Sequence, residues 1–245
     1  MPRKLARLFV ESELFQGQRL SLDLRESHYL GNVLRLTSGD AFLIFNGRDG
    51  EWVAEVAQTT KKQTNVNVKE LVRSQKDDFP VALLFSPLKA GPLGFLMEKA
   101  TELGVTDFYP LWTTRTQGRD FRHERYLSII REASEQSERM SVPFLHKPLF
   151  LDKLLTQWDR EKELLICDER PGGQNLFDLL QGENVMNSVV IGPEGGFSPE
   201  EFEFLDRLPN AIFVSLGQNV LRAETAALSA LSLLHSKISW MQGLS

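Results

Sequence analysis

"VVIGPEGGFSPEEFEFL", residues 189–205, joins a short apolar run to a helix start through a loop rich in glycine. Ser198-Pro199-Glu200-Glu201 has the pattern of a capping box with proline at the first helical position, so we expect a helix to begin there. The run before Gly192 is apolar without alternation, which is typical of a strand buried on both faces. A buried strand, a loop and a helix in succession predict one unit of an α/β fold.

The same alternation extends through the chain from Val81. The apolar runs that we predict to be strands cover residues 81–88, 105–113, 163–169, 188–192 and 211–217. Helical periodicity is strongest over about residues 92–103, 122–140 and 224–237. This alternation predicts a mostly parallel sheet covered by helices on both faces.

The first 73 residues predict a smaller, β-rich unit. Strand-like runs flank Asn46-Gly47 and Asp49-Gly50, which is a strong hairpin signal. Further strands are predicted at residues 6–10, 19–24 and 64–71, with a short helix at 27–36. Strands at this spacing suggest a small barrel. The polar stretch "SQKDDFP", residues 74–80, is the predicted linker, so we expect one domain at 1–73 and a second at 74–245.

Composition narrows the class of protein. The 245 residues are 42% hydrophobic and 25% charged, as in ordinary globular proteins, and no run of about 18 apolar residues could span a membrane. Cys167 is the single cysteine, so no internal disulfide can form, and a reducing cytoplasm is the expected location. The four histidines lack the spacing of metal ligands, so we expect no bound metal.

The charge is unevenly distributed. The formal net charge of −5 argues against binding nucleic acid over the whole surface. The first 78 residues hold 12 Lys and Arg against 11 Asp and Glu, whereas the remaining 167 hold 16 against 22. If the protein contacts nucleic acid, most of the cations come from its first 150 residues.

The loop at residues 192–196 poses a question that the helix cap does not answer. Capping at Ser198 has no need of Gly192, Gly195 and Gly196, and glycine also lets a ligand approach the backbone closely. The loop matches neither phosphate-binding glycine pattern, and Glu194 would repel a phosphate. A tight turn and a small-molecule loop are both compatible with the spacing.

Two other segments follow predicted strands, where ligands bind in open α/β sheets. The first is "PLWTTRT", residues 110–116, and the second is "SLGQNVLRAETAAL", residues 215–228. In the second, Arg222 and Glu224 lie among small and apolar residues. An exposed ion pair is one interpretation, but two glycine-containing loops that follow adjacent apolar strands favour a site.

At these residues the sequence resembles a known family. "IGPEGGFSPEE" and "LGQNVLRAETAAL", together with "ARLFV", "HYLGNVLRLTSGD", "EKATELGVTDFYPL" and "EASEQSERMSVP", are similar in identity and order to motifs of the RsmE family of ribosomal RNA methyltransferases, in the SPOUT superfamily. The resemblance covers the whole chain.

The resemblance implies an N-terminal PUA-like β-barrel and a C-terminal SPOUT α/β domain with a deep trefoil knot. It implies S-adenosyl-L-methionine as the cofactor. The implied reaction is methylation of uracil N3 at one uridine of 16S rRNA, in the decoding region of the small ribosomal subunit. It also implies a homodimer with the active site at the subunit interface.

The resemblance further implies a set of site residues. Arg222 is the candidate for stabilising charge on uracil, because N3 must lose its proton and guanidinium stays charged, and Glu224 is the candidate for orienting Arg222 or accepting the proton. Glu224 capping the last helix is the structural alternative. RNA contacts are expected from Arg7, Arg35 and Arg115. Cofactor contacts are expected from Leu111, Thr113, Ile191, Gly192, Glu194, Gly195, Gly196, Leu216, Gly217, Val220, Leu221 and Thr225.

One departure from the family pattern lies beside these residues. Family members commonly carry Pro-Arg where this chain has Gln218-Asn219, so no catalytic cation is assigned at Asn219.

Two rival hypotheses about the function remain. One is another SPOUT RNA methyltransferase, acting on a ribose hydroxyl or a different base. The other is a non-catalytic ribosome-assembly factor that binds RNA through the barrel.

Overall fold

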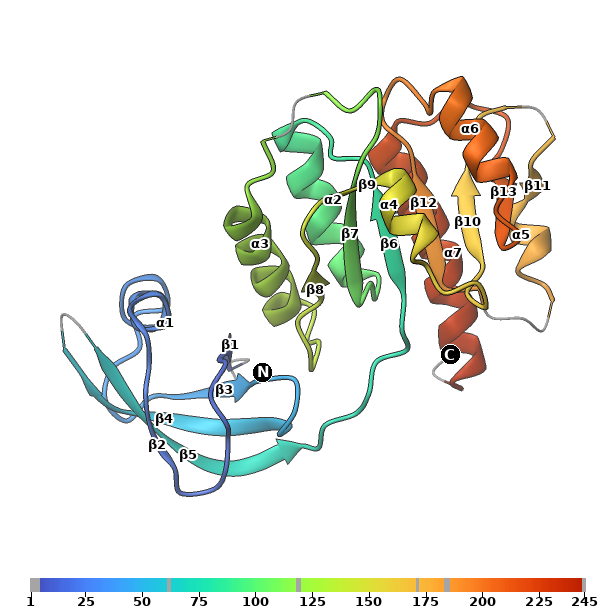
Figure 1. The fold of residues 1–245 in the computed structure, drawn as a ribbon. Coiled ribbons are helices and arrows are strands. Elements are labelled where there is room, and N and C mark those ends of the chain that lie inside the picture. Colours follow the sequence, from blue (N-terminus) through green and yellow to red (C-terminus); the bar gives the residue numbers. More distant parts are fainter. Residues whose placement is uncertain (1–4, 61–62, 118–119, 171, 183–185, 244–245) are drawn as a thin grey trace. The chain divides into compact units, whose positions relative to one another are not determined.

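A computed structural model describes residues 5–60, 63–117, 120–170, 172–182 and 186–243 (Figure 1). The chain forms two compact units, one of residues 1–78 and 134–142, the other of residues 79–133 and 143–245. The short segment 134–142 therefore groups with the first unit, although it lies within the sequence of the second.

Unit 1 is built on a five-stranded sheet. The strand order is β1-β3-β4-β5-β2, with β1 parallel to β3 and the other pairs antiparallel. Its core is formed by Phe42 and Ile44 of β3, Ala54 and Val56 of β4, and Val66 and Val68 of β5, all at most 1% exposed. The strands are β1 (Arg7–Phe9), β2 (Arg19–Ser21), β3 (Ala41–Phe45), β4 (Glu51–Thr59) and β5 (Thr64–Arg73).

The β3–β4 hairpin forms where the sequence predicts it. The Asn46 side-chain oxygen accepts hydrogen bonds from the Arg48 and Asp49 N–H groups, at 3.0 and 2.9 Å, and this Asx turn reverses the chain. The predicted helix at 27–36 begins earlier, as α1 (Leu24–His28). Asp23 and Glu26 form a capping box there, and one π-helical turn, η1 (Tyr29–Val33), follows.

Unit 2 contains a sheet in the order β11-β13-β10-β12-β6-β7-β8, with β9 also on β7, and every pair is parallel. This confirms the predicted parallel α/β architecture. The strands are β6 (Ala82–Phe85), β7 (Asp107–Trp112), β8 (Phe144–Leu145), β9 (Leu149–Phe150), β10 (Leu164–Cys167), β11 (Gln174–Asn175), β12 (Ser188–Ile191) and β13 (Ala211–Ser215).

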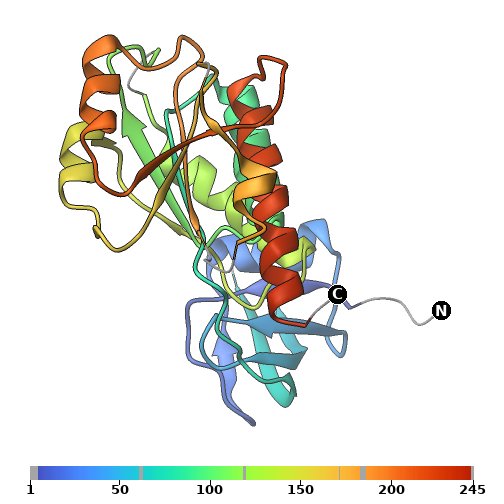
Figure 2. The same cartoon turned by 90° about the vertical axis from the view of Figure 1, so that its right-hand side faces the viewer.

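Helices cover both faces of this sheet (Figure 2). On one face, Leu151 and Leu155 of α4 and Leu205 of α6 pack against apolar side chains of the strands. On the other, α2 lies beside α7, and α7 contacts β10 and β12. The helices are α2 (Ala90–Glu102), α3 (His123–Gln136), α4 (Leu151–Thr156), α5 (Leu176–Leu179), α6 (Pro199–Asp206) and α7 (Ala223–Met241).

Candidate active site

The loops singled out in the sequence all leave the carboxyl edge of the unit 2 sheet. They follow β7, β12 and β13, and because all strand pairs are parallel, these ends lie on one edge. The expectation that the last two loops follow adjacent strands is wrong: β10 pairs with both β12 and β13 and lies between them. β12 instead adjoins β6, and the Ser86 N–H donates to the Ile191 carbonyl at 3.0 Å.

The three glycines of the loop after β12 have three different reasons. A Cβ on Gly192 would approach the Phe197 ring to 3.1–3.3 Å, so Gly192 makes room for that buried ring. Gly196 has φ +69° and closes a turn by donating to the Pro193 carbonyl at 2.8 Å. Gly195 has neither constraint, because its Cβ would meet only Arg115, at an ordinary 3.6 Å. Packing thus accounts for Gly192 and the turn for Gly196, which leaves exposed Gly195 available for a ligand.

The loop after β7 holds the glycine loop in place. Arg115 Nη1 donates to the Gly195 carbonyl at 2.7 Å, and the Thr114 N–H donates to Glu201 at 2.7 Å. Glu201 also accepts from the Ser198 N–H at 2.8 Å, so it completes the capping box of α6 and fastens Thr114 at the same time. These bonds give Arg115 a role within the protein that the RNA-binding prediction did not include.

Three hydroxyls anchor this loop to the end of β6. Thr116 Oγ1 accepts from the Thr113 N–H at 2.9 Å and lies 2.7 Å from Ser86 Oγ and 2.8 Å from Thr113 Oγ1. Ser86 is fully buried and Thr113 is 4% exposed. Sequence reasoning did not select Ser86 or Thr116, because isolated hydroxyl residues carry no local signal of a tertiary cluster.

The loop after β13 offers both an open backbone and apolar surface. Gly217 has φ +128° and open space on the side where a Cβ would lie. Val220 is 77% exposed, while Leu216 and Leu221 are half-buried. An apolar side chain as exposed as Val220 beside a glycine suits the face of a ligand ring.

Arg222 and Glu224 lie at the start of α7. Arg222 is the N-cap residue, with φ −64° and ψ 153°; its side chain is exposed and does not cap the helix. Glu224 lies in the first turn, where a carboxylate interacts favourably with the helix dipole, so the structural alternative for Glu224 retains a physical basis. Exposed Thr225 follows in the same turn.

Two predicted cofactor contacts are core side chains. Leu111 is fully buried, within the cluster that packs against α4 and α6, and Ile191 is 3% exposed. These two residues can therefore meet a ligand only through main-chain groups. Glu194 is exposed, with a side chain free of that constraint.

The two RNA-contact candidates in unit 1 differ sharply. Arg35 is exposed, with φ +58°. Arg7 is 6% exposed; it donates to Glu51 at 2.5 Å and to the Ser134, Glu135 and Arg139 carbonyls at 2.7–3.0 Å. Phe45 covers the Arg7 guanidinium, with its ring centroid at 4.3 Å. The geometry argues against Arg7 as a phosphate contact, because its donors are already used to join 134–142 to the sheet of unit 1.

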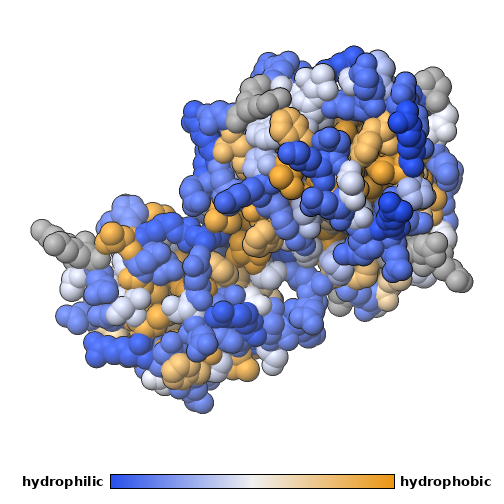
Figure 3. All heavy atoms as spheres, viewed as in Figure 1, coloured by the Kyte–Doolittle hydropathy of each residue, from blue (hydrophilic) through white to orange (hydrophobic). Residues whose placement is uncertain are grey.

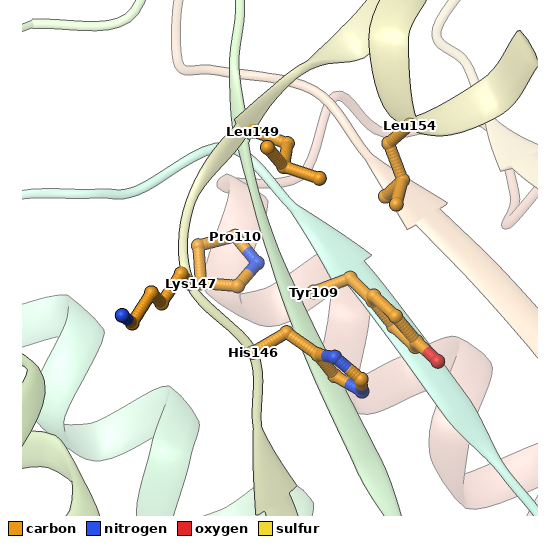
Figure 4. Close-up of a pocket in the computed structure, with 6 residues that line it drawn as sticks. All are labelled: Tyr109, Pro110, His146, Lys147, Leu149 and Leu154. Carbon is orange, nitrogen blue, oxygen red and sulfur yellow. The ribbon is translucent and has the colours of Figure 1, made fainter. Parts of the chain in front are cut away.

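A cavity of about 180 Å³ lies in unit 2 beside β7, at the sheet edge formed by β8 and β9 (Figure 4). Tyr109 stacks on His146 with ring centroids 3.8 Å apart, and His146 Nε2 lies 3.1 Å from Asp107 Oδ1. The lining residues are Tyr109, Pro110, His146, Lys147, Leu149 and Leu154. The sequence signals that could have indicated it are Pro110 inside a strand and Pro148 between two apolar pairs.

Comparisons with known proteins match both parts of the chain. An RNA methyltransferase domain family matches residues 75–235, and an RNA methyltransferase PUA domain family matches residues 22–69. A ribosomal RNA small subunit methyltransferase E from Rickettsia conorii is 33% identical over 94% of both chains. The chain belongs to the ribosomal RNA small subunit methyltransferase E family. The predicted family and the PUA-like character of the N-terminal domain are thereby confirmed.

Two solved structures are closely similar to the structure of this chain. A methyltransferase from Legionella pneumophila, in complex with its cofactor SAM, is 30% identical with a TM-score of 0.85, over 95% of this chain and 98% of that one. A ribosomal RNA small subunit methyltransferase E from Neisseria gonorrhoeae, bound to S-adenosyl methionine, is 25% identical with a TM-score of 0.84, over 95% and 97%. Two relatives with the same fold as this chain thus bind SAM.

The described residues contain no group of three or more His, Cys, Asp and Glu side chains arranged to hold a metal ion. None of the helices within the described ranges is both long and apolar enough to cross a membrane.

Proposed function

We propose that this protein methylates uracil N3 at one uridine of 16S rRNA, in the decoding region of the small ribosomal subunit, with S-adenosylmethionine as the methyl donor. The family and the SAM-bound relatives support this reaction class. The observation in this chain that carries it is Gly195. It is an exposed glycine that neither φ nor packing demands, held by Arg115 at the carboxyl edge of a parallel sheet.

The residues present fit such a cofactor. Gly195 and Gly217 leave the backbone of two loops open, exposed Val220 offers an apolar wall, and Glu194 offers a free carboxylate that could accept from ribose hydroxyls. Gly192, Gly196, Leu216, Leu221 and the main chain at Thr113 would complete the site. When bound, S-adenosylmethionine supplies a sulfonium methyl group as the electrophile.

The chain's own residues would prepare uracil for attack. N3 carries negative charge once its proton is lost, and that charge spreads onto the neighbouring carbonyl oxygens. The Arg222 guanidinium, exposed at the start of α7, would donate to this carbonyl edge and stabilise the charge. Glu224 would orient Arg222 or accept the proton.

We also propose that the protein acts in the cytoplasm as a two-fold homodimer, in which the active site is completed between the two subunits. Exposed Arg35, in the first domain (residues 1–73), would contact an RNA phosphate. A trefoil knot in the second domain, near residues 74–245, belongs to the same proposal.

The decisive experiment uses small ribosomal subunits purified from a strain that lacks this protein. Incubation with the purified protein and labelled S-adenosylmethionine should add one methyl group per subunit, and mass spectrometry of the digested RNA should place it on uracil N3. Subunits from the parent strain, already methylated, should accept none.

Other outcomes would replace the proposal. A methyl group on a ribose hydroxyl or another base would keep the cofactor and reject the assigned atom. Absence of transfer, with no calorimetric binding of S-adenosylmethionine, would favour a non-catalytic assembly factor.

A further inference from the structure

The cavity at the edge of unit 2 has a backbone cause. The Phe108 carbonyl accepts a hydrogen bond from the His146 N–H at 2.9 Å, so the main-chain groups of Phe108 point toward the edge strand that contains β8. Main-chain groups point to alternate sides along a strand, so those of Pro110 point to the same side as those of Phe108, but Pro110 has no N–H to donate. The edge strand is divided there into β8 and β9, and residues 146–148 lie between the two paired segments, with His146 still bonded to Phe108. The cavity lies at this interruption (Figure 4).

The size and walls of the cavity limit what it can hold. Its volume of about 180 Å³ is below the roughly 300–1,000 Å³ of sites for drug-sized ligands, so it suits one ring system. Its walls are the stacked Tyr109 and His146 side chains together with Pro110, Lys147, Leu149 and Leu154. Such a pocket accepts a flat, largely apolar group.

Exposed aromatic rings flank the cavity along the same edge. Phe144 of β8 is 62% exposed and Phe150 of β9 is 40% exposed. In the view of Figure 3, hydrophobic side chains remain visible among hydrophilic ones on the face of unit 2 that carries β9 and α4. Aromatic residues in a row on a surface are the means by which proteins stack successive bases of single-stranded nucleic acid.

Two lysines lie along this edge. Exposed Lys147 lines the cavity, and Lys153 Nζ lies 5.9 Å from the Phe150 ring centroid. Of the two carboxylates closest in sequence or pairing, Asp107 is engaged by His146 at 3.1 Å and by the Thr106 hydroxyl at 2.9 Å, whereas Asp152, next to Lys153, is exposed. Lys147 at the cavity therefore offers a positive charge to a phosphate, although unit 2 as a whole is rich in acidic residues.

We propose that the edge formed by β8, residues 146–148 and β9 binds single-stranded RNA, with one nucleobase in the cavity and a phosphate at Lys147. This surface would be a second RNA contact within unit 2, beginning beside the loop after β7, because Phe150 pairs with Trp112 at the end of that strand. The inference rests on the proposed function, because an RNA substrate gives the surface its ligand.

The test measures anisotropy of a labelled, unstructured RNA oligonucleotide as a function of salt. Phe150→Ala should weaken binding about tenfold, since one base loses its stacking partner. Lys147→Ala should weaken it several-fold and reduce the slope of log affinity against log salt by about 0.7, the value for one phosphate on a single strand. Phe177→Ala, at an exposed phenylalanine of α5, is the matched control for the ring and should bind normally.

A second readout places the RNA directly. Photocrosslinking with 4-thiouridine in the oligonucleotide should label the peptide that contains residues 144–154, and Leu154→Trp, which fills the cavity, should abolish that crosslink in a protein with an unchanged melting profile. Crosslinks confined to other peptides, or normal affinity and salt slope in both Lys147→Ala and Phe150→Ala, would overturn the proposal.

Two further measurements separate this proposal from its foundation. If light scattering shows that Leu154→Trp changes the oligomeric state while RNA binding stays normal, the cavity holds a second copy of the chain, and the proposal is wrong. If the wild-type protein methylates small subunits but the edge variants bind RNA normally, this inference fails while the proposed function stands.

Discussion

Arg115 donates from Nη1 to the Gly195 carbonyl at 2.7 Å, so the loop after β7 fixes the loop after β12. The two residues lie 80 positions apart in the sequence, yet the bond determines where the glycine loop's main chain points. A glycine-rich binding loop needs such external support, because glycine backbone has large conformational freedom.

Gly195→Val should weaken binding of S-adenosylmethionine at least tenfold, about 1.4 kcal/mol, because branched carbons would occupy the face of the loop offered to the ligand. The first added carbon meets Arg115 only at 3.6 Å, so the variant should fold. Calorimetry checks the affinity and circular dichroism the fold. Gly196→Val is a poorer probe, because φ +69° strains any side chain there. Unchanged affinity in folded Gly195→Val would leave the loop a simple turn.

Arg115→Ala should weaken the same binding about fivefold, about 1 kcal/mol, the net contribution of one hydrogen bond. If Arg115 acts only by positioning Gly195, the salt slope of RNA binding should not change. Arg122→Ala, at another exposed arginine, is the control. A slope smaller by about 0.7 with normal cofactor affinity would instead identify Arg115 as the phosphate contact that the sequence predicted.

Arg222→Lys should slow methyl transfer about a hundredfold, roughly 2.7 kcal/mol, because it keeps the charge but loses the planar donor pair. Since charge on uracil develops during the reaction, the loss should be in the single-turnover rate at saturating cofactor and subunits. Arg207→Lys, at an exposed arginine that directly follows α6, should be normal. A normal rate with weakened subunit binding would show that Arg222 binds phosphate.

Arg7→Ala should destabilise the protein by about 3 kcal/mol, because Glu51 loses its closest partner and three backbone carbonyls lose a donor. Arg73, which lies 3.3 Å from Glu51, limits the loss. Denaturant unfolding measures the change, and Arg35→Ala should stay within about 0.5 kcal/mol of wild type. A stable Arg7→Ala variant with a reduced RNA salt slope would restore Arg7 as an RNA contact.

Cys167 should resist alkylation in the folded protein. Although the residue as a whole is partly exposed, desolvation of its thiol raises the pKa from 9.0 to about 12, which favours the neutral form. Because the thiolate is the nucleophile, iodoacetamide at pH 8 should react about a thousandfold more slowly than with the denatured chain. Mass spectrometry measures the alkylation rate, and equal rates for the folded and the denatured protein would contradict this prediction.

The sequence predicted the elements whose causes are local. The Ser198 cap, the Asn46-Gly47 hairpin and the alternation of apolar runs with helical periodicity lead to the observed helix start, the β3–β4 turn and the parallel sheet. A cap or an Asx turn is satisfied by residues two or three positions away, so neighbouring letters contain the whole interaction.

Tertiary structure alone decided how the site residues are used. Gly192 makes room for the Phe197 ring, although nothing in the sequence distinguishes it from Gly195. Arg7 is buried against residues 134–139, although nothing in the sequence distinguishes it from Arg35. β10 enters between β12 and β13, and the cavity opens where Pro110 meets a broken edge strand. Each outcome depends on partners that chain folding brings from distant positions, and the burial and hydrogen bonds that distinguish these residues exist only once the partners are in place.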